Sequence, residues 1–350
     1  MRHTKLLAKH FNLQRFANAN TQTTLMNGVS PYTNDLSPEM KTYYKTRLLD
    51  YAEPNLVHDQ FGDDYPIPAN NGKTIEFRKY DSLAKATTPL TEGVTPDGTN
   101  LNVTAINATV SQYGAYVTIS DMLKLTAIDN NIVQALKLLG SQAGRTLDTI
   151  TRDALAGGTN VIYAGGRASR SALTTADTLT PAYFFMAAAQ LEAMNAPKID
   201  GECYVAIIHP YAAFDLMRSS EWLEVHKYAA PENIFKGEIG RLGNVRFVQT
   251  TEAKVWKASA DNCPSYTESS TTKYYGVFST IVLGANAYAK TNVEGGGLQT
   301  IVKQLGSGED PLNQRATVGW KATKVAKRLV EQYMVRIESL SAYSKSVSAN

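Results

Sequence analysis

The sequence has few cysteines and no long apolar run. Its 350 residues include only Cys203 and Cys263, and neither lies in a C-x-x-C pair. Two cysteines are too few for a disulfide framework, so we expect free thiols in a reducing compartment. No apolar stretch approaches the roughly 18 residues that a membrane helix needs. The basic N-terminal segment is interrupted by Lys9, His10 and Gln14, so we expect neither membrane insertion nor secretion.

Catalytic and nucleotide-binding motifs are also missing. The five histidines form no H-E-x-x-H pattern, and there is neither a G-x-S-x-G elbow nor a G-x-x-x-x-G-K-[ST] phosphate loop. The strongest catalytic candidate is His209, at the end of the apolar run VAIIHP, with Asp215 close enough in sequence to orient it. A lone histidine at a strand end is more often structural, and no nucleophile accompanies it. The sequence thus predicts no catalytic residue and no cofactor.

One short stretch, HDQFGDDY, offers metal ligands close together. Its candidates are His58, Asp59, Asp63 and Asp64. The stretch lacks the spacing and the closing glutamate of a 12-residue calcium loop. A polar turn is the favoured interpretation, and a metal site is the alternative.

The charge is weak overall and uneven along the chain. A formal net charge of +3 does not mark the whole chain as a polyanion binder. Two segments are nevertheless locally basic. Arg2, Lys5, Lys9 and Arg15 precede the first acid at Asp35, and the second cluster consists of Lys321, Lys324, Lys327, Arg328 and Arg336. A solvated face is the plainer interpretation of each cluster, and a phosphate-binding surface is the alternative.

Hydrophobic periodicity predicts one long helix. From Ile132 to Ala154, apolar residues recur at steps of three and four. Asp129 is a suitable N-cap, and Gly157-Gly158 is a suitable end.

The rest of the chain mixes helix and strand patterns. Residues 1–55 are polar and are expected to form an arm with a short helix over residues 38–51. Beyond the long helix we predict, in chain order, a helix at 181–194, a strand at 204–208, a helix from Tyr211 toward His226, strands at 244–250 and 275–290, and a half-buried strand at 333–338. This order indicates an α+β or α/β fold, and α+β is our prediction.

A long loop separates two strand-like runs ahead of the long helix. Residues 74–80 (TIEFRKY) and 101–120 have strand character, and PLTEGVTPDGTN, residues 89–100, lies between them. Hairpin loops usually hold 2 to 5 residues, so roughly twenty at a hairpin tip is unusual. A disordered insertion, an active-site lid and a projecting arm are the alternatives. The lid is the weakest of these, because no site lies beneath it.

Five segments spread over the chain resemble a known family. They are FNLQRFA, TEGVTPDGTNLNVTAINATVSQYGAYVTISD, ECYVAIIHPYAAFDLM, GEIGRLGNVRFVQT and GEDPLNQRATVGWKATKVAKRLVEQYMVRIES. Together they resemble the major capsid proteins of tailed bacteriophages, whose fold is shared with herpesvirus shells and encapsulin compartments. The specificity comes from five segments that agree in order, since no single motif is catalytic.

The resemblance implies a phage major capsid fold with five parts. An N-terminal arm would take residues 1–55, and peripheral-domain strands with an extended loop (about 70–120) would take residues 56–130. A spine helix would follow at 131–159 and an axial domain at 160–297. Residues 298–350 would return as strands to the peripheral domain and the C-terminus.

The resemblance also implies a function. A major capsid protein would assemble as pentamers and hexamers into an icosahedral shell around double-stranded DNA. Assembly would take place in the host cytoplasm, and the protein would end in the virion. Its partners would be itself, a separate scaffolding protein, a portal, the packaged DNA and a decoration protein in some relatives. The alternatives are an encapsulin-like cargo compartment and, remotely, a cytosolic enzyme that uses His209.

Two sets of contact residues are expected on this interpretation. Glu92, Asp97 and Lys85 near the loop tip are candidate contacts with a neighbouring subunit. The candidates for sequence-independent contacts with phosphates of packaged DNA are Arg2, Lys5, Lys9, Arg15, Lys321, Lys324, Lys327 and Arg328.

Overall fold

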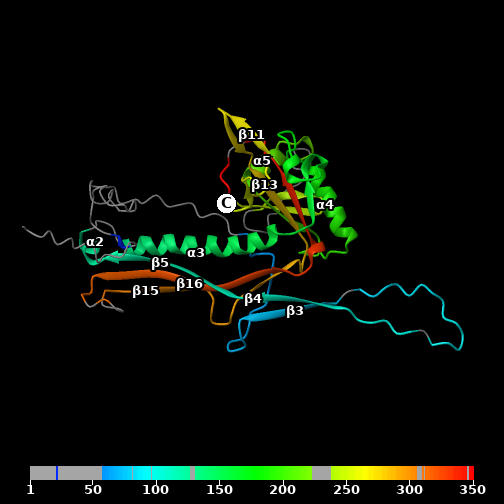
Figure 1. The fold of residues 1–350 in the computed structure, drawn as a ribbon, viewed down its shortest axis with the longest axis horizontal. Helices are drawn as coiled ribbons and strands as arrows, with labels where there is room; N and C mark the ends of the chain where they lie inside the picture. The colour runs from blue at the N-terminus through cyan, green and yellow to red at the C-terminus, as the bar shows by residue number, and fades with distance from the viewer. Residues whose placement is uncertain are drawn as a thin grey trace, which may run out of the picture. The chain divides into compact units, whose positions relative to one another are not determined.

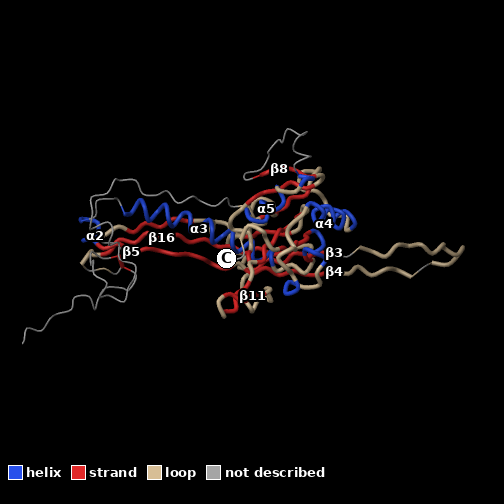
Figure 2. Tube along the Cα trace, turned by 90° about the horizontal axis from the view of Figure 1, so that it is seen from above, coloured by secondary structure: helices blue, strands red, loops and turns tan. Residues whose placement is uncertain are grey.

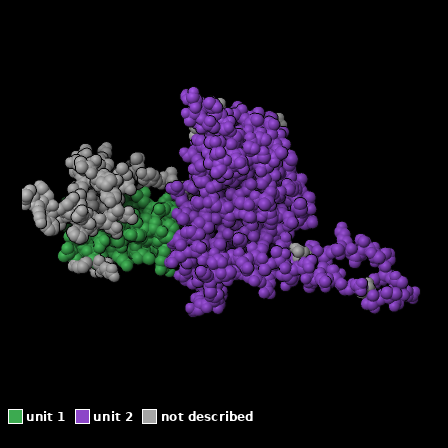
Figure 3. Space-filling model, viewed as in Figure 1, with its two compact units in different colours: residues 1–51, 114–143, 298–321 green, residues 52–113, 144–297, 322–350 purple. Residues whose placement is uncertain are grey.

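The structure is a computed structural model of the chain. It describes residues 21–22, 57–80, 82–95, 97–126, 131–222, 238–305, 310, 312–344 and 347–350. The chain divides into two compact units, coloured separately in Figure 3. Unit 1 holds residues 1–51, 114–143 and 298–321, and unit 2 holds residues 52–113, 144–297 and 322–350. No helix in the described part of the chain is long and apolar enough to cross a membrane.

Unit 2 is built around a seven-stranded sheet with the strand order β6-β17-β13-β7-β9-β8 and with β10 paired to β13. Its strands are β6 (Val161–Tyr163), β7 (Tyr204–Ile208), β8 (Glu238–Leu242), β9 (Val245–Gln249), β10 (Val255–Trp256), β13 (Val277–Leu283) and β17 (Met334–Ser339). Parallel pairs (β17 with β6, β7 with β9) and antiparallel pairs (β13 with β17 and with β7) occur together. The α+β class predicted from the sequence is confirmed.

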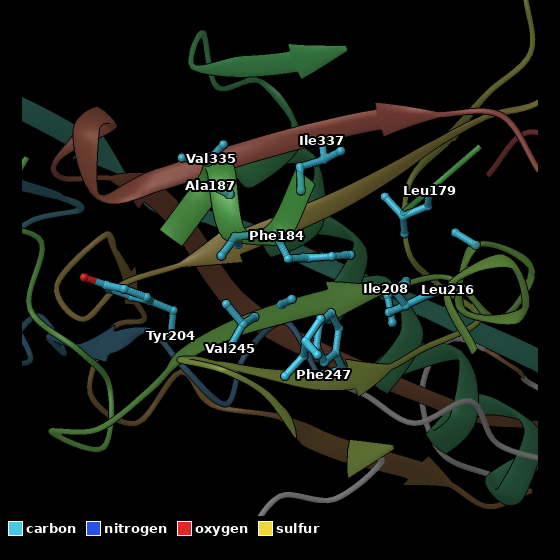
Figure 4. Close-up of a cluster of buried hydrophobic side chains, with 14 of the residues drawn as sticks. Leu179, Phe184, Ala187, Tyr204, Ile208, Leu216, Val245, Phe247, Val335 and Ile337 are labelled. Atoms are coloured by element: carbon cyan, nitrogen blue, oxygen red, sulfur yellow. The ribbon is translucent and has the colours of Figure 1, made fainter. Parts of the chain in front are cut away.

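Helices α4 (Pro181–Ala193) and α5 (Pro210–Met217) pack on one face of this sheet. The rings of Phe184 in α4 and Phe247 in β9 meet edge to face with centroids 4.6 Å apart, a geometry that aromatic pairs favour (Figure 4). The opposite face of the sheet presents Val205, Ile207 and other apolar side chains to a second cluster. β7 and β13 are therefore buried on both faces, which explains the continuous apolar sequence of β7, YVAII, and the burial of all seven residues of β13, VFSTIVL.

A second sheet follows the order β1-β5-β16-β14-β2, with β15 also paired to β16. Its strands are β1 (Thr21–Gln22), β2 (Asp63–Asp64), β5 (Ser111–Ser120), β14 (Tyr288–Thr291), β15 (Gln299–Lys303) and β16 (Arg315–Arg328). In unit 1, β5 and β16 approach closely at Gly114, where an added Cβ would lie 2.6 Å from the Trp320 carbonyl oxygen. Glycine is needed there because any side chain would push the strands apart.

The long helix predicted from periodicity is confirmed as α3, Asn131–Ala156, a helix of 26 residues. Gly157 and Gly158 follow it, and their amides donate to the carbonyls of Asp153 and Leu155 at 3.2 and 3.1 Å. The expected N-cap, Asp129, lies outside the described residues. A short helix, α2 (Asp121–Thr126), precedes α3, and the described residues also form the 3₁₀ turns η2 (Ala164–Gly166), η3 (Arg170–Ala172) and η4 (Glu331–Tyr333).

Strands β3 (Thr74–Tyr80) and β4 (Val103–Thr109) form a separate antiparallel hairpin in unit 2. Their register runs from Thr74↔Thr109 to Tyr80↔Val103. The connecting residues 81–102 leave the strand ends and extend away from them (Figures 1 and 2). The over-long hairpin loop is as predicted. However, the run 101–120 is two strands, separated at Val110, whose amide donates to the Lys73 carbonyl at 2.8 Å.

A second hairpin in unit 2 was not predicted. β11 (Ser265–Glu268) and β12 (Thr271–Tyr274) pair across a two-residue turn. The turn residues Ser269 and Ser270 have φ values of 50° and 63°. Asn-Gly is the usual sequence for such a turn, and its absence removes the local signal for a hairpin.

The helix predicted from Tyr211 toward His226 is shorter in the structure. α5 ends at Met217, and the Ser219 hydroxyl accepts a hydrogen bond from the Trp222 amide at 3.3 Å at the start of a new helical segment. Serine side chains compete with helix continuation in this way. Residues 223–226 lie outside the described part of the chain.

Two strand predictions also require correction. The run 275–290 is not one strand, because β13 ends at Leu283 and β14 begins at Tyr288, with Asn286 between them at φ 58°. The expected half-buried return strand, 333–338, is β17, which lies between β13 and β6 in the seven-stranded sheet. All six of its residues are buried, since both faces of this central strand are covered.

Candidate assembly surface

Residues 81–102, which we call the extended loop, expose every described side chain. They contain no helix or strand in the described positions. Two local hydrogen bonds shape the backbone, from the Thr87 amide to the Lys85 carbonyl and from the Val94 amide to the Thr91 carbonyl, both 3.1 Å. Gly93 adopts a φ of 79° beside the second of these. A segment with so little internal bonding gains order chiefly from contacts with other surfaces.

Large apolar side chains are among those that the extended loop exposes. Leu90 is 76% exposed, Leu101 67% and Val94 62%. Tyr80 and Val103, the last pair of the β3–β4 ladder, are exposed as well. Several large apolar side chains exposed on one projecting segment are a candidate interaction surface.

The base of the hairpin, in contrast, is attached to unit 2. The rings of Phe77 in β3 and Tyr65 meet edge to face with centroids 5.6 Å apart. The Lys79 ammonium donates to the Gln332 amide oxygen at 3.5 Å. The hairpin is thus fixed at its base, whereas the described residues of its loop are exposed.

The three charged candidates on the extended loop are all exposed. Lys85, Glu92 and Asp97 form no ion pair with other described residues and present their charges to solvent. The structure places them on one loop. Their pairing with a neighbouring subunit stays a prediction.

The basic cluster near the C-terminus includes one lysine that is not available at a surface. Lys324 is only 8% exposed, and its ammonium donates to the Asp59 carboxylate and, at 3.1 Å, to the Leu147 carbonyl. The Thr151 hydroxyl donates to the same carboxylate at 2.6 Å. Lys324 therefore does not fit its expected role as a DNA contact, because its charge is neutralised inside unit 2.

The other basic candidates differ in availability. Arg328 is half-buried and donates to Glu331 at 2.8 Å and to the Ala154 carbonyl. Lys321 and Lys327 are exposed. The candidates of the N-terminal arm lie outside the described residues: Arg2, Lys5, Lys9 and Arg15.

Of the four ligand candidates in HDQFGDDY, two bind other side chains and the other two lie in a strand. His58 Nδ1 lies 2.7 Å from Asp148 Oδ2, and the His58 amide donates to the same side chain at 2.9 Å. Asp59 binds Lys324, whereas Asp63 and Asp64 form β2. Among the residues that the structure describes, no group of three or more His, Cys, Asp or Glu could hold a metal ion. The stretch serves to attach the chain to α3.

His209 acts as a helix cap. It is 7% exposed, and its Nδ1 accepts a hydrogen bond from the Tyr211 amide at 3.1 Å at the start of α5. Its ring packs against that of Phe278, with centroids 4.9 Å apart. Asp215 instead accepts from the Ala342 amide at 3.1 Å. The two groups proposed for the enzyme alternative therefore serve different backbone donors.

Replacing His209 by asparagine is expected to reduce the loss of stability in mild acid. Burial lowers the pKa of His209 from 6.5 to about 4. The unfolded chain then binds more protons than the folded chain in this range, so stability falls as pH decreases from 6.5 toward 4. Linkage gives about 2 kcal/mol of destabilisation at pH ~5. Asparagine keeps a capping oxygen but does not titrate.

Urea unfolding of both free subunits at neutral pH and in mild acid measures this difference. The wild type should lose more stability than His209→Asn between the two conditions. An equal loss in both proteins would contradict the assignment.

The sequence matches a known protein family over most of its length. A family model described as phage capsid protein matches residues 102–336, more than half of the chain. The chain belongs to the phage capsid protein family. The resemblance found in the five sequence segments is thereby confirmed at the level of the family. No curated protein matches the sequence.

Solved capsids share the fold of this phage capsid protein. The capsid of cyanophage P-SCSP1u has a TM-score of 0.63 at 14% identity, covering 90% of this chain and 98% of that chain. The capsid of cyanophage Pam1 has a TM-score of 0.65 at 14% identity, covering 89% and 100%. An encapsulin complex from Synechococcus elongatus has a TM-score of 0.55 at 10% identity, covering 91% and 99%. At these identities the similarity shows the fold alone.

The phage capsid protein also contains a buried charge cluster that the sequence did not reveal. Glu338 of β17 is fully buried, accepts hydrogen bonds from Arg170 at 2.6 and 2.8 Å, and forms an ion pair with Arg336 at 2.9 Å. The Arg170 guanidinium lies 3.8 Å from the centroid of the Trp256 ring. Arg336 also donates to the Ala156 carbonyl at the end of α3. The alternation in MVRIES was the available signal, but it is equally typical of a half-exposed strand.

Proposed function

We propose that this phage capsid protein is the major capsid subunit, which assembles as pentamers and hexamers into an icosahedral shell around double-stranded DNA. The extended loop carries the proposal, because it presents exposed apolar side chains that another surface must cover. The role is one of binding without turnover, and the chain is not an enzyme on this proposal. Assembly takes place in the bacterial host cytoplasm, and the product is the virion capsid.

The energetics of the extended loop favour a shell over a simple pair of subunits. Burying one large apolar side chain contributes about 1.5–3 kcal/mol, whereas ordering the backbone of one residue costs about 1–2 kcal/mol. The four large aliphatic side chains that the loop exposes (Leu83, Leu90, Val94 and Leu101) cannot offset the ordering of the whole loop. Main-chain pairing and the several simultaneous contacts of a closed lattice supply the remainder.

We also propose that the interior of the shell contacts DNA phosphates without sequence preference. Lys321, Lys327 and Arg328 remain candidates, as do the arm residues Arg2, Lys5, Lys9 and Arg15, and the buried Lys324 is omitted. Such contacts weaken as salt rises. The apolar contacts between subunits do not, so raised salt should loosen DNA from the wall before shells dissociate. The further partners on this proposal are a scaffolding protein, a portal and, where present, a decoration protein.

An encapsulin-like compartment is the second candidate, because an encapsulin complex shares the fold. The two candidate particles differ in what they enclose. Particles purified from cells that produce the whole phage should contain DNA on the first proposal. A co-purified cargo protein without DNA would favour the second.

Protection of the extended loop from trypsin tests the proposal. Lys85 is the one lysine or arginine between residues 81 and 102, so trypsin cuts the loop after a single position. Free subunits should be cleaved there readily, since the side chain and its neighbours are exposed. Assembled particles, identified by negative-stain microscopy, should be cleaved at least about tenfold more slowly if the loop lies on a neighbour.

Lys85→Gln is the matched control, because it should abolish this cut in free subunits and leave other cuts unchanged. Equal cleavage of free and assembled protein at Lys85 would contradict the placement of the loop on a neighbour. Failure to form particles under any condition, including with a scaffolding protein, would contradict the shell.

A further inference from the structure

The turn that leads into β3 contains an Asn-Gly pair in an exposed position. The Asn71 amide donates to the Pro68 carbonyl at 3.3 Å, and Asn70 and Gly72 adopt φ values of 67° and 82°. Asn71 and Gly72 are both exposed. A Cβ built on Gly72 would meet nothing within 4 Å, so the space around its backbone is open.

The Gly72 amide is free to react. The structure shows no hydrogen-bond acceptor for it among the described residues, whereas the next residue, Lys73, accepts from the Val110 amide at 2.8 Å. The ladder of β3 thus begins just after the Asn-Gly pair, and the pair itself lies outside the ladder. A backbone nitrogen that donates no hydrogen bond and has no side chain beside it is an accessible nucleophile.

We propose that Asn71 is a site of spontaneous deamidation. The Gly72 nitrogen loses its proton to water and attacks Asn71 Cγ, forming a new C–N bond. The Cγ–Nδ2 bond breaks, and ammonia leaves with a proton from water. Water then opens the five-membered imide at either carbonyl, which yields aspartate or isoaspartate. The net reaction consumes one water and releases one ammonia, with no oxidation or reduction.

The structure selects Asn71 over other asparagines of the described chain. Asn195, Asn262 and Asn286 also lie at positive φ, but each is followed by a residue with a side chain that crowds the attacking nitrogen. Asn70 is followed by Asn71 and is crowded in the same way.

Deamidation changes the hairpin locally. It places a negative charge two residues before Lys73, and isoaspartate lengthens the main chain by one bond just ahead of the first β3–β4 pair, Thr74↔Thr109. Because every subunit carries the site, a stored particle would gain negative charge progressively. This chemistry does not depend on the proposed function.

Peptide mapping of the aged full-length protein tests the proposal. Trypsin releases residues 48–73, a peptide that holds Asn55, Asn70 and Asn71. After incubation of the folded protein in mildly alkaline buffer, Asn71 should gain about 1 Da, with conversion at least about tenfold faster than at the other two asparagines. The isolated 48–73 peptide, incubated in parallel, should convert at a rate within about tenfold of the folded protein, because the turn leaves the site open.

Two variants distinguish Asn71 from the neighbouring Asn70. Asn70→Ser should leave the rate unchanged, and Asn71→Asp should give, before any incubation, a 48–73 peptide of the same mass as the aged one. Conversion of the peptide with an intact Asn71 in the folded protein would overturn the proposal. Equal conversion of Asn70 and Asn71 would overturn it as well.

Discussion

A subunit in which residues 81–102 are replaced by an Asn-Gly turn is expected to fold and to form no closed shells. The replacement joins Tyr80 to Val103, which already face each other at the end of the β3–β4 ladder. Asn-Gly is the preferred two-residue hairpin turn, so the strands need not shift. The base of the hairpin keeps its contact between Phe77 and Tyr65. What the variant loses is the exposed apolar surface of the extended loop.

Sedimentation and negative-stain microscopy measure the result. The wild type should sediment mainly as particles, and the loop variant should remain as subunits or small oligomers under the same conditions. Its circular dichroism and urea midpoint should match those of the wild-type subunit. Normal shells from the variant would show that the loop has no part in assembly.

The second hairpin of unit 2 supplies a matched control. Ser269→Asn with Ser270→Gly inserts the same Asn-Gly pair into the β11–β12 turn, where both residues already have positive φ. This change removes no exposed apolar residue. Shells should form as in the wild type, which separates the loss of the loop from the introduction of a turn.

Glu338→Ala is expected to lower the free energy of unfolding by about 3–5 kcal/mol. The carboxylate is fully buried and balances Arg170 and Arg336, so its removal leaves two guanidinium groups without a counter-charge. Burial already lowers the pKa of Arg336, which shows how poorly that site solvates a cation. Natural domains are stable by about 5–15 kcal/mol, so a loss of this size shifts the urea midpoint strongly.

An exposed ion pair provides the control for this variant. Glu268 and Lys273 pair at 2.7 Å on the β11–β12 hairpin, and both side chains are about half exposed. Glu268→Ala should leave the urea midpoint unchanged. Replacing the three buried charges together with apolar residues of similar size should recover much of the stability that Glu338→Ala loses. Similar midpoints for Glu338→Ala and Glu268→Ala would contradict the importance of the buried cluster.

The sequence predicted the elements whose signals are local. α3 has a periodic apolar face and a glycine pair at its end, and α4 begins at a proline, so both follow from the sequence alone. β7 follows from an apolar run of the right length. Tertiary contacts explain where the sequence-based prediction was wrong. The alternating pattern of β17 predicts that Arg336 and Glu338 are exposed to solvent. They are buried because Arg170, 168 residues from Glu338 in sequence, binds the carboxylate.

For the candidate assembly surface, too, features set by local sequence could be predicted and features set by tertiary contacts could not. The over-long loop itself could be predicted, because loop length and turn residues are local properties. Its length and composition left a disordered insertion, a lid and a projecting arm open, and only the family resemblance favoured an arm that contacts a neighbour. The availability of each charge is partly local, because strand alternation places Lys324 on the opposite face of β16 from Lys321 and Lys327. Tertiary contacts then bring in Asp59 from a distant part of the chain, and Asp59 pairs with the buried Lys324.

The position of β17 also bears on how the protein is made. This strand leaves the ribosome after both β6 and β13, between which it lies in the folded sheet. Until residues 334–339 are synthesised, the edges of β6 and β13 that β17 will pair with stay open, and such non-local pairing is slow to form. A prematurely terminated chain would therefore lack a central strand. Synthesis through residue 339 therefore becomes a condition for completing the seven-stranded sheet.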